Sequence, residues 1–166
     1  CRADLFMRIY QSMATNDSSS IPKSGAKKSA ASDDASPPLG EPVIRTIAMP
    51  ADTNPAGDIF GGWIMSQMDL AAGNAASRYG QGRCATVAVE GMTFLSPVKV
   101  GDEVTVWAHM IKVGRSSMTF DVQAWRRPRD GEGQTCVTRA VFTFVALDAD
   151  GRPRTLPTGP RGQTWV

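Results

Sequence analysis

Apolar and polar side chains alternate along two segments in the second half of the sequence, residues 104–110 and residues 118–124. A period of two puts alternate side chains on opposite faces of a β-strand, so each segment is predicted to be a strand with one buried face. The buried faces are expected to consist of Val104, Val106, Ala108 and Met110 in the first strand and of Met118, Phe120, Val122 and Ala124 in the second. The few turn-forming residues between the two segments predict a hairpin.

β-Branched and aromatic residues are concentrated in three further segments, 43–49, 86–98 and 135–147, which are also predicted to be strands. Residues 61–79 differ, because they are rich in Met, Ala, Leu and Gln, contain no Pro and end at a Gly-Gln-Gly run. That composition predicts one long helix. The order of elements is therefore strand, helix and four strands, which indicates an α+β domain with an antiparallel sheet around a single helix.

The composition changes after residue 42. Residues 11–42 contain eight Ser and only two large aliphatic residues, too few to offset the entropy of ordering by burial. We therefore predict a disordered tail over residues 1–42, a folded domain over residues 43–157 and a short C-terminal tail over residues 158–166. Because the sequence starts with a cysteine, translation is expected to begin at Met7 or Met13, with a processed lipoprotein as the alternative.

The charge balance and the cysteines exclude several classes of protein. The 166 residues include 18 Lys and Arg and 16 Asp and Glu, and a net charge of +2 lacks the basic surface of a nucleic-acid-binding protein. Three cysteines without a C-x-x-C spacing argue against a disulfide framework and a zinc site, and favour the cytoplasm. No apolar stretch approaches the roughly 20 residues that cross a bilayer, so we expect no membrane partner.

Common catalytic motifs are also missing. The single histidine, His109, lies in a predicted strand, which makes a metal pair or a Ser-His-Asp triad improbable. We expect it to face solvent or a neighbouring subunit. Neither a G-x-x-x-x-G-K-[ST] nor a G-x-G-x-x-G motif occurs, so these phosphate-binding loops are excluded and no cofactor or metal is expected.

Gly61 and Gly62 begin the predicted helix. Free N–H groups at a helix N-terminus, together with the helix dipole, can stabilise an anion or a developing oxyanion, and glycine lets a carbonyl group approach closely. The alternative interpretation is a flexible start of the helix, with Asp58 as an acid that the dipole favours. On spacing alone, the second interpretation is favoured.

Asp69 lies in the middle of the helix among apolar neighbours, where partial removal from water would suit a general base, although a solvated position is the alternative. Asp58 precedes the helix, so the two acids are at least about 12 Å apart along the axis and cannot serve one water within a chain. If both act in one site, they must come from two protomers of a two-fold dimer.

These segments resemble the YciA-type acyl-CoA thioester hydrolases of the hotdog superfamily. The resemblance is carried by residues 48–50, 54–69 (NPAGDIFGGWIMSQMD), 87–94, 97–102, 112–117 and 140–146, and spans about residues 44–157. It implies a hotdog fold, hydrolysis of acyl-CoA to a free acid and CoA, active sites at dimer interfaces, and assembly of the homodimers into tetramers or hexamers. It implies no cofactor, because CoA is part of the substrate.

The resemblance also assigns roles to individual residues. Asp69 is expected to activate the attacking water or, as the alternative, to attack the thioester itself, while Gly61 and Gly62 hold the carbonyl oxygen. Asn54 and Asp58 are expected to orient water or substrate from a second protomer. Contact with the pantetheine and phosphate end of CoA is expected from a turn that contains Lys112, Gly114, Arg115, Ser116 and Ser117. The alternative for this turn is a simple hairpin with a solvated arginine.

Residues 126–129 are expected to form a loop with a solvated run of charges, although its arginines could alter the phosphate site. A non-catalytic acyl-CoA sensor on the same fold is one alternative function, which Asp69 disfavours. A hotdog hydratase is another, and the position of His109 far downstream in a strand disfavours it.

Overall fold

The structure is a computed structural model that describes residues 36–157. Most of the predicted N-terminal tail and all of the C-terminal tail therefore lie outside the described residues, and the flexibility of both tails stays a prediction. Of residues 36–42, Gly40 contacts the folded domain, since its carbonyl oxygen accepts a hydrogen bond of 3.2 Å from Trp107 Nε1.

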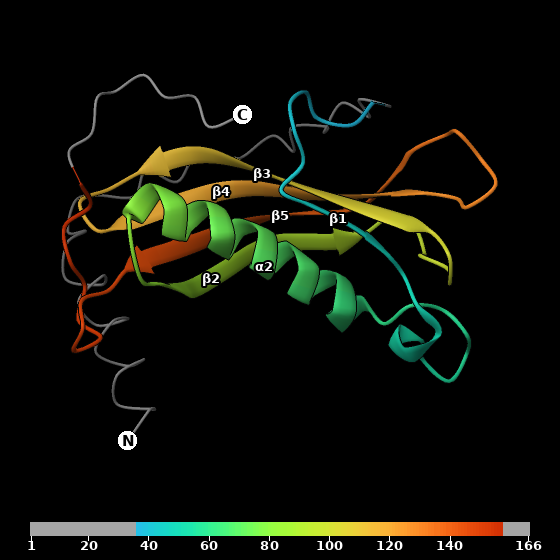
Figure 1. Cartoon of the computed structure of the whole chain (residues 1–166), viewed down its shortest axis with the longest axis horizontal. Helices are drawn as coiled ribbons and strands as arrows, with labels where there is room; N and C mark the ends of the chain where they lie inside the picture. Colours follow the sequence, from blue (N-terminus) through green and yellow to red (C-terminus); the bar gives the residue numbers. More distant parts are fainter. Residues whose placement is uncertain (1–35, 158–166) are drawn as a thin grey trace, which may run out of the picture. The chain divides into compact units, whose positions relative to one another are not determined.

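Five strands form one antiparallel sheet, and a single helix lies across one of its faces (Figure 1). The strands are β1 (Ile44–Ile47), β2 (Cys84–Phe94), β3 (Glu103–Val113), β4 (Ser117–Arg127) and β5 (Thr135–Ala146), in the spatial order β1-β3-β4-β5-β2. A short 3-10 helix, η1 (Pro50–Asp52), follows β1, and helix α2 (Gly61–Gly80) precedes β2. The two edges of the sheet are therefore β1 and β2.

Helix α2 covers the apolar face of the sheet. The helix residues against the sheet are Ile64, Met68, Ala71, Ala72 and Ala76, all of them buried. The predicted apolar faces of β3 and β4 pack against the same core, which confirms the alternation seen in the sequence. The helix ends one residue later than predicted, where Gln81 takes a left-handed conformation (φ 50°) and its N–H bonds to carbonyls of the last turn.

The ends of two strands differ from the prediction. β2 stops at Phe94 rather than at residue 98, after a register shift near Gly91, whose φ is +69°. β4 continues to Arg127, so the prediction of a solvated run of charges is wrong for its first two arginines. Arg126 pairs with the buried Asp102 at 3.1 Å, and Arg127 pairs with Glu103 at 3.2 Å. The partners of these arginines come from β3 and the turn before it, which are distant in sequence.

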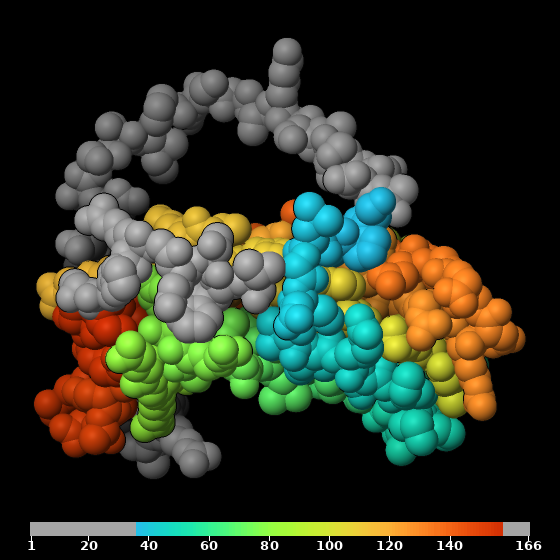
Figure 2. Space-filling view, turned by 45° about the horizontal axis from the view of Figure 1, so that its top comes forward, coloured from blue at the N-terminus to red at the C-terminus, as the bar shows by residue number. Residues whose placement is uncertain are grey.

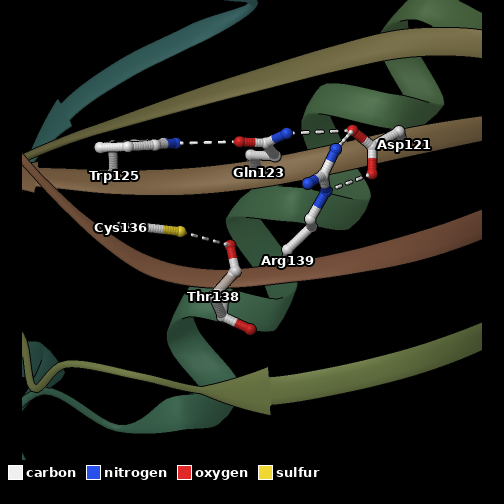
Figure 3. Close-up of polar contacts among 6 residues, drawn as sticks. All are labelled: Asp121, Gln123, Trp125, Cys136, Thr138 and Arg139. Carbon is white, nitrogen blue, oxygen red and sulfur yellow. Dashed lines mark hydrogen bonds and ion pairs between the residues drawn. The ribbon is translucent and has the colours of Figure 1, made fainter. Parts of the chain in front are cut away.

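Polar side chains interact on the face of the sheet away from α2 (Figure 3). Both oxygens of Asp121 accept hydrogen bonds from Arg139, at 2.9 and 2.8 Å, and Gln123 Nε2 donates to Asp121 Oδ2 at 3.0 Å. Burial acts to raise the pKa of Asp121, but the hydrogen bonds from Arg139 and Gln123 outweigh it and hold the pKa below its ordinary value. The ionised carboxylate therefore stabilises the sheet.

Replacement of Asp121 by Asn should lower the free energy of unfolding by about 1 kcal/mol near neutral pH, because the charged pair with the largely exposed Arg139 is lost. Since the pKa of Asp121 is lower in the folded than in the unfolded chain, its contribution is complete above about pH 4 and disappears as the pH falls through the lowered value. Urea unfolding of both proteins at about pH 7 and about pH 3 measures this change.

The matched control is Asp130→Asn, because Asp130 is exposed and has no ion pair within residues 36–157. Its stability should equal that of the wild type at both pH values. An equal loss for Asp121→Asn at both pH values would contradict the charge-based explanation.

Candidate active site

The loop before α2 is shaped by Asn54. Asn54 Oδ1 accepts hydrogen bonds from the N–H groups of Ala56 (2.9 Å) and Asp58 (3.1 Å), and the Asn54 N–H donates to the Asp58 carbonyl at 2.7 Å. The side-chain oxygen of Asn54 is thus used within the loop, and its predicted role toward water stays a prediction. The half-buried Asp58 carboxylate has no hydrogen-bond partner among residues 36–157, so it remains available to a ligand or a second chain.

The N-terminus of α2 offers two free donors. Phe60 occupies the N-cap position without a side-chain hydrogen bond, and the first N–H groups that bond to its carbonyl are those of Trp63 and Ile64. Within the described part of the chain, the N–H groups of Gly61 and Gly62 have no acceptor. A Cβ added at Gly62 would meet no atom within 4 Å, so there is open space beside this residue. Free N–H groups of this kind suit an anion, and the predicted role of Gly61 and Gly62 toward the carbonyl oxygen stays a prediction.

Asp69 is held by a residue that the sequence did not single out. Thr86 Oγ1, on β2, donates a hydrogen bond of 2.5 Å to Asp69 Oδ1, and both residues are half-buried. One carboxylate oxygen is thereby fixed, while Oδ2 has no partner among the described residues. No sequence signal identified Thr86, because it lies 17 residues from Asp69 in the chain. The two residues meet only through the packing of α2 against the sheet.

One chain does not bring the acid and the free amides together. Gly61 and Asp69 lie on the same straight helix, eight residues apart, which corresponds to about 12 Å along its axis. A single water cannot contact both groups at that separation. In one chain the free amides and the acid are thus separated by about two turns of α2.

The surface beside Asp69 is suited to a second chain. Among residues 36–157, β2 pairs with β5 alone, so within this range its other edge has free backbone donors and acceptors. Apolar side chains are exposed near this edge, with Leu70 on α2 60% exposed and Val89 on β2 41% exposed. An open strand edge with adjacent exposed apolar side chains is typical of an interface between subunits.

The turn expected to contact CoA lies at the other end of α2. The Arg115 carbonyl accepts a hydrogen bond of 2.9 Å from the Leu156 N–H, and Arg154 Nη2 donates to the carbonyl of Gly80, the last helix residue, at 2.5 Å. In Figure 2, the loop before α2 (teal) and the segment after β5 (red) lie at opposite ends of the described part of the chain. A helix of 20 residues is about 30 Å long, so Arg115 and Gly61 of one chain are far apart.

Residues 36–157 contain neither an activated cysteine nor a cluster of metal ligands. Burial raises the pKa of the Cys84 and Cys136 thiols, so neither is an activated nucleophile. No group of three His, Cys, Asp or Glu side chains in this range could hold a metal ion. His109 lies opposite Asp121 in the sheet, away from Asp69. None of the described helices is both long and apolar enough to span a bilayer.

Known proteins resemble this chain in sequence and in structure. The profile of the thioesterase superfamily matches residues 56–132. The acyl-CoA thioester hydrolase YciA of Salmonella typhimurium is 51% identical over 123 residues, which cover 72% of this chain and 92% of the relative. The hexameric thioesterase y2039 from Yersinia pestis is 54% identical, with a TM-score of 0.70 over 74% of this chain and 99% of that chain.

A hexameric hotdog fold thioesterase of Campylobacter jejuni is 38% identical, with a TM-score of 0.66 over 71% of this chain and 91% of that chain. The predicted hotdog fold, an α+β arrangement of one long helix on a five-stranded antiparallel sheet, is thus confirmed. The matched residues 56–132 include Gly61, Gly62, Asp69 and Thr86. By sequence and by structure, the chain belongs to the YciA-type acyl-CoA thioester hydrolases of the hotdog thioesterase superfamily.

Proposed function

We propose that this protein hydrolyses acyl-CoA thioesters with Asp69 as general base and the α2 N-terminus as oxyanion hole. The water oxygen attacks the thioester carbonyl carbon while Asp69 takes a proton from the water. The tetrahedral oxyanion then collapses and the C–S bond breaks, which releases the free acid and the CoA thiolate. The thiolate takes up the proton from Asp69, so CoA leaves as its thiol and the base is regenerated. No cofactor enters this scheme.

The hydrogen bond between Thr86 and Asp69 is the observation that carries this proposal. It fixes one carboxylate oxygen and leaves Oδ2 free, as expected of a base that has to meet a water in one orientation. Asp69 is also half-buried, which limits the contact of its carboxylate with bulk water. The alternative, direct attack of Asp69 on the thioester, requires the same free oxygen. A single turnover in ¹⁸O-labelled water distinguishes the two, because attack by water always places the label in the product acid, whereas attack by Asp69 can place it in the Asp69 carboxylate.

The free amides of Gly61 and Gly62 support the second half of the mechanism. A donor is most effective where negative charge develops in the transition state, and two adjacent N–H groups at a helix N-terminus add the helix dipole to their hydrogen bonds. Each donor of this kind contributes about 10²- to 10³-fold to the rate in known enzymes.

The separation of Asp69 from these amides supports a homodimer as the active unit. If two chains join along the free edges of β2 about a two-fold axis, their α2 helices run antiparallel, and Asp69 of one chain approaches the α2 N-terminus of the other. Exposed Leu70 and Val89 would be buried in that interface. Since solved relatives are hexameric thioesterases, we propose that three such dimers form a hexamer, rather than two a tetramer.

The same symmetry gives the turn around Arg115 a role. Within a chain it lies beside the C-terminus of α2, so antiparallel helices bring it toward the N-terminus of the partner's α2. We infer that CoA whose thioester lies at Gly61 and Gly62 of one chain meets the exposed Lys112 and Arg115 of another. Arginine suits phosphate because its planar guanidinium donates two parallel hydrogen bonds.

Asp69→Asn should lower kcat by about 10²- to 10⁴-fold and leave KM and thermal stability almost unchanged, because only the proton acceptor is removed. A thiol-release assay with acyl-CoA measures the rate, and circular dichroism verifies the fold. Asp130→Asn, an exposed acid remote in sequence from the site, is the matched control and should retain full activity. A normal rate for Asp69→Asn would refute its role as base.

Thr86→Val keeps the size of the side chain but removes the hydroxyl donor, so kcat should fall about tenfold or more while KM stays the same. Thr86→Ser restores the donor and should recover most of the rate. A structural role alone would instead reduce stability in both variants without a difference in kcat. Equal kcat values for Val and Ser would rule out the positioning of Asp69 by this hydrogen bond.

Subunit mixing tests the shared site directly. Gly62→Pro removes the second free N–H, and Gly62→Ala is its control because the added methyl group has open space. We expect Asp69→Asn and Gly62→Pro to be nearly inactive alone. After both are unfolded and refolded together, half of the dimers are mixed and each has one intact site, so about a quarter of the wild-type activity returns. No recovery, with mixed dimers verified by mass, would show that both groups act within one chain.

A further inference from the structure

A pocket opens at the first turn of α2, directly beside the free amide of Gly61. Its volume is about 340 Å³, at the small end of the range for ligand sites. Gly61 forms part of the wall, and the apolar side chains of the wall are those of Ile59, Ile64, Phe94, Leu95, Val98 and Val137. The pocket therefore borders one of the two residues of the proposed oxyanion hole.

The chemistry of this wall favours a hydrocarbon. Ser96 is the only residue of the wall with a polar side chain, and its Oγ accepts a hydrogen bond of 3.2 Å from Arg126 Nε. Arg126 also pairs with Asp102 at 3.1 Å, so neither charge is available to a ligand in the pocket. A charged group placed there would lose its hydration without a new partner, whereas an alkyl chain gains from the transfer out of water.

The pocket is built on fixed elements. The Leu95 N–H bonds to the Val137 carbonyl at 2.8 Å, and the Ile59 N–H bonds to the Val98 carbonyl at 3.0 Å. These bonds tie the loop before α2 and the segment after β2 to the sheet. Ile59, Val98 and Val137 are buried, so most of the wall cannot move without disturbing the core.

Phe94 is the exception, because its side chain is 47% exposed. Its ring lies against the backbone of Gly61, where an added Cβ would stand 3.2 Å from Cζ and 3.5 Å from Cε2. Phe94 is the last residue of β2 and follows the register shift between Glu90 and Thr93. The ring therefore borders both the free amide and the pocket.

We propose that this pocket binds the acyl chain of the substrate and that Phe94 limits the chain length. This inference rests on the proposed thioesterase function. With the carbonyl oxygen at the amides of Gly61 and Gly62, one substituent of the thioester carbon must enter the apolar pocket. The other substituent continues from sulfur to the polar pantetheine and phosphates, so the acyl chain is the part that matches the wall.

The test compares kcat/KM for CoA thioesters of straight saturated acids from butyryl to palmitoyl. Phe94→Ala enlarges the pocket and should raise the palmitoyl-to-butyryl ratio about tenfold over the wild type, whereas Phe94→Trp should lower it by a similar factor. Phe94→Leu should raise the same ratio by a smaller factor, and it replaces the alanine variant in the test if that variant does not fold. Ile111→Ala removes another exposed apolar strand side chain, remote from the pocket, and should leave the ratio unchanged.

The outcomes separate the two proposals. If the wild type releases thiol from acyl-CoA but all Phe94 variants keep its order of preference, the assignment of the pocket is overturned and the catalytic proposal stands. If the wild type cleaves none of the thioesters, the proposed function itself fails, and the acyl-chain assignment fails with it. A shift in the ratio caused by Ile111→Ala as large as that caused by Phe94→Ala would also overturn the role of Phe94.

Discussion

The rigidity of α2 is the constraint on which the rest of the site depends. An α-helix rises about 1.5 Å per residue, so Gly61 and Asp69 stay about 12 Å apart along the axis regardless of how the loops around them move. Each chain thus carries the free N–H groups at one end of the helix and the acid two turns away. A reaction that needs both groups at one carbonyl has to combine two chains, which makes assembly part of the chemistry.

Small side chains allow this helix to lie close to the sheet. Ala71, Ala72 and Ala76 are completely buried, and a Cβ at Gly73 would stand 3.5 Å from the ring of Phe144. Close packing of this kind fixes the helix in one position, because a shift along the axis would open cavities or force contacts. Asp69 can meet Thr86 at hydrogen-bond distance only because the helix is held in this way.

β2 links the parts of the site. Thr86 near its start contacts Asp69, Phe94 at its end lies against Gly61, and the strand between them has an open edge. The strand is irregular, with register shifts on both sides of residues 88–90, and Gly91 takes a φ of +69° that side chains other than glycine rarely adopt. Irregularities of this kind change the direction of side chains along a strand, and beyond this one the Phe94 ring lies against Gly61.

Local patterns in the sequence were sufficient to predict the helix and the strands. The alternation with a period of two and the composition of residues 61–79 depend only on residues that are neighbours in the chain. They identified the helix, the buried faces of β3 and β4, and the glycines and acid that the family resemblance then assigned to the site. The sequence did not reveal Thr86, the ion pairs of Arg126 and Arg127, or the distance between the Arg115 turn and Gly61. These features join residues distant in the chain, so only the register of the sheet and the docking of α2 decided them.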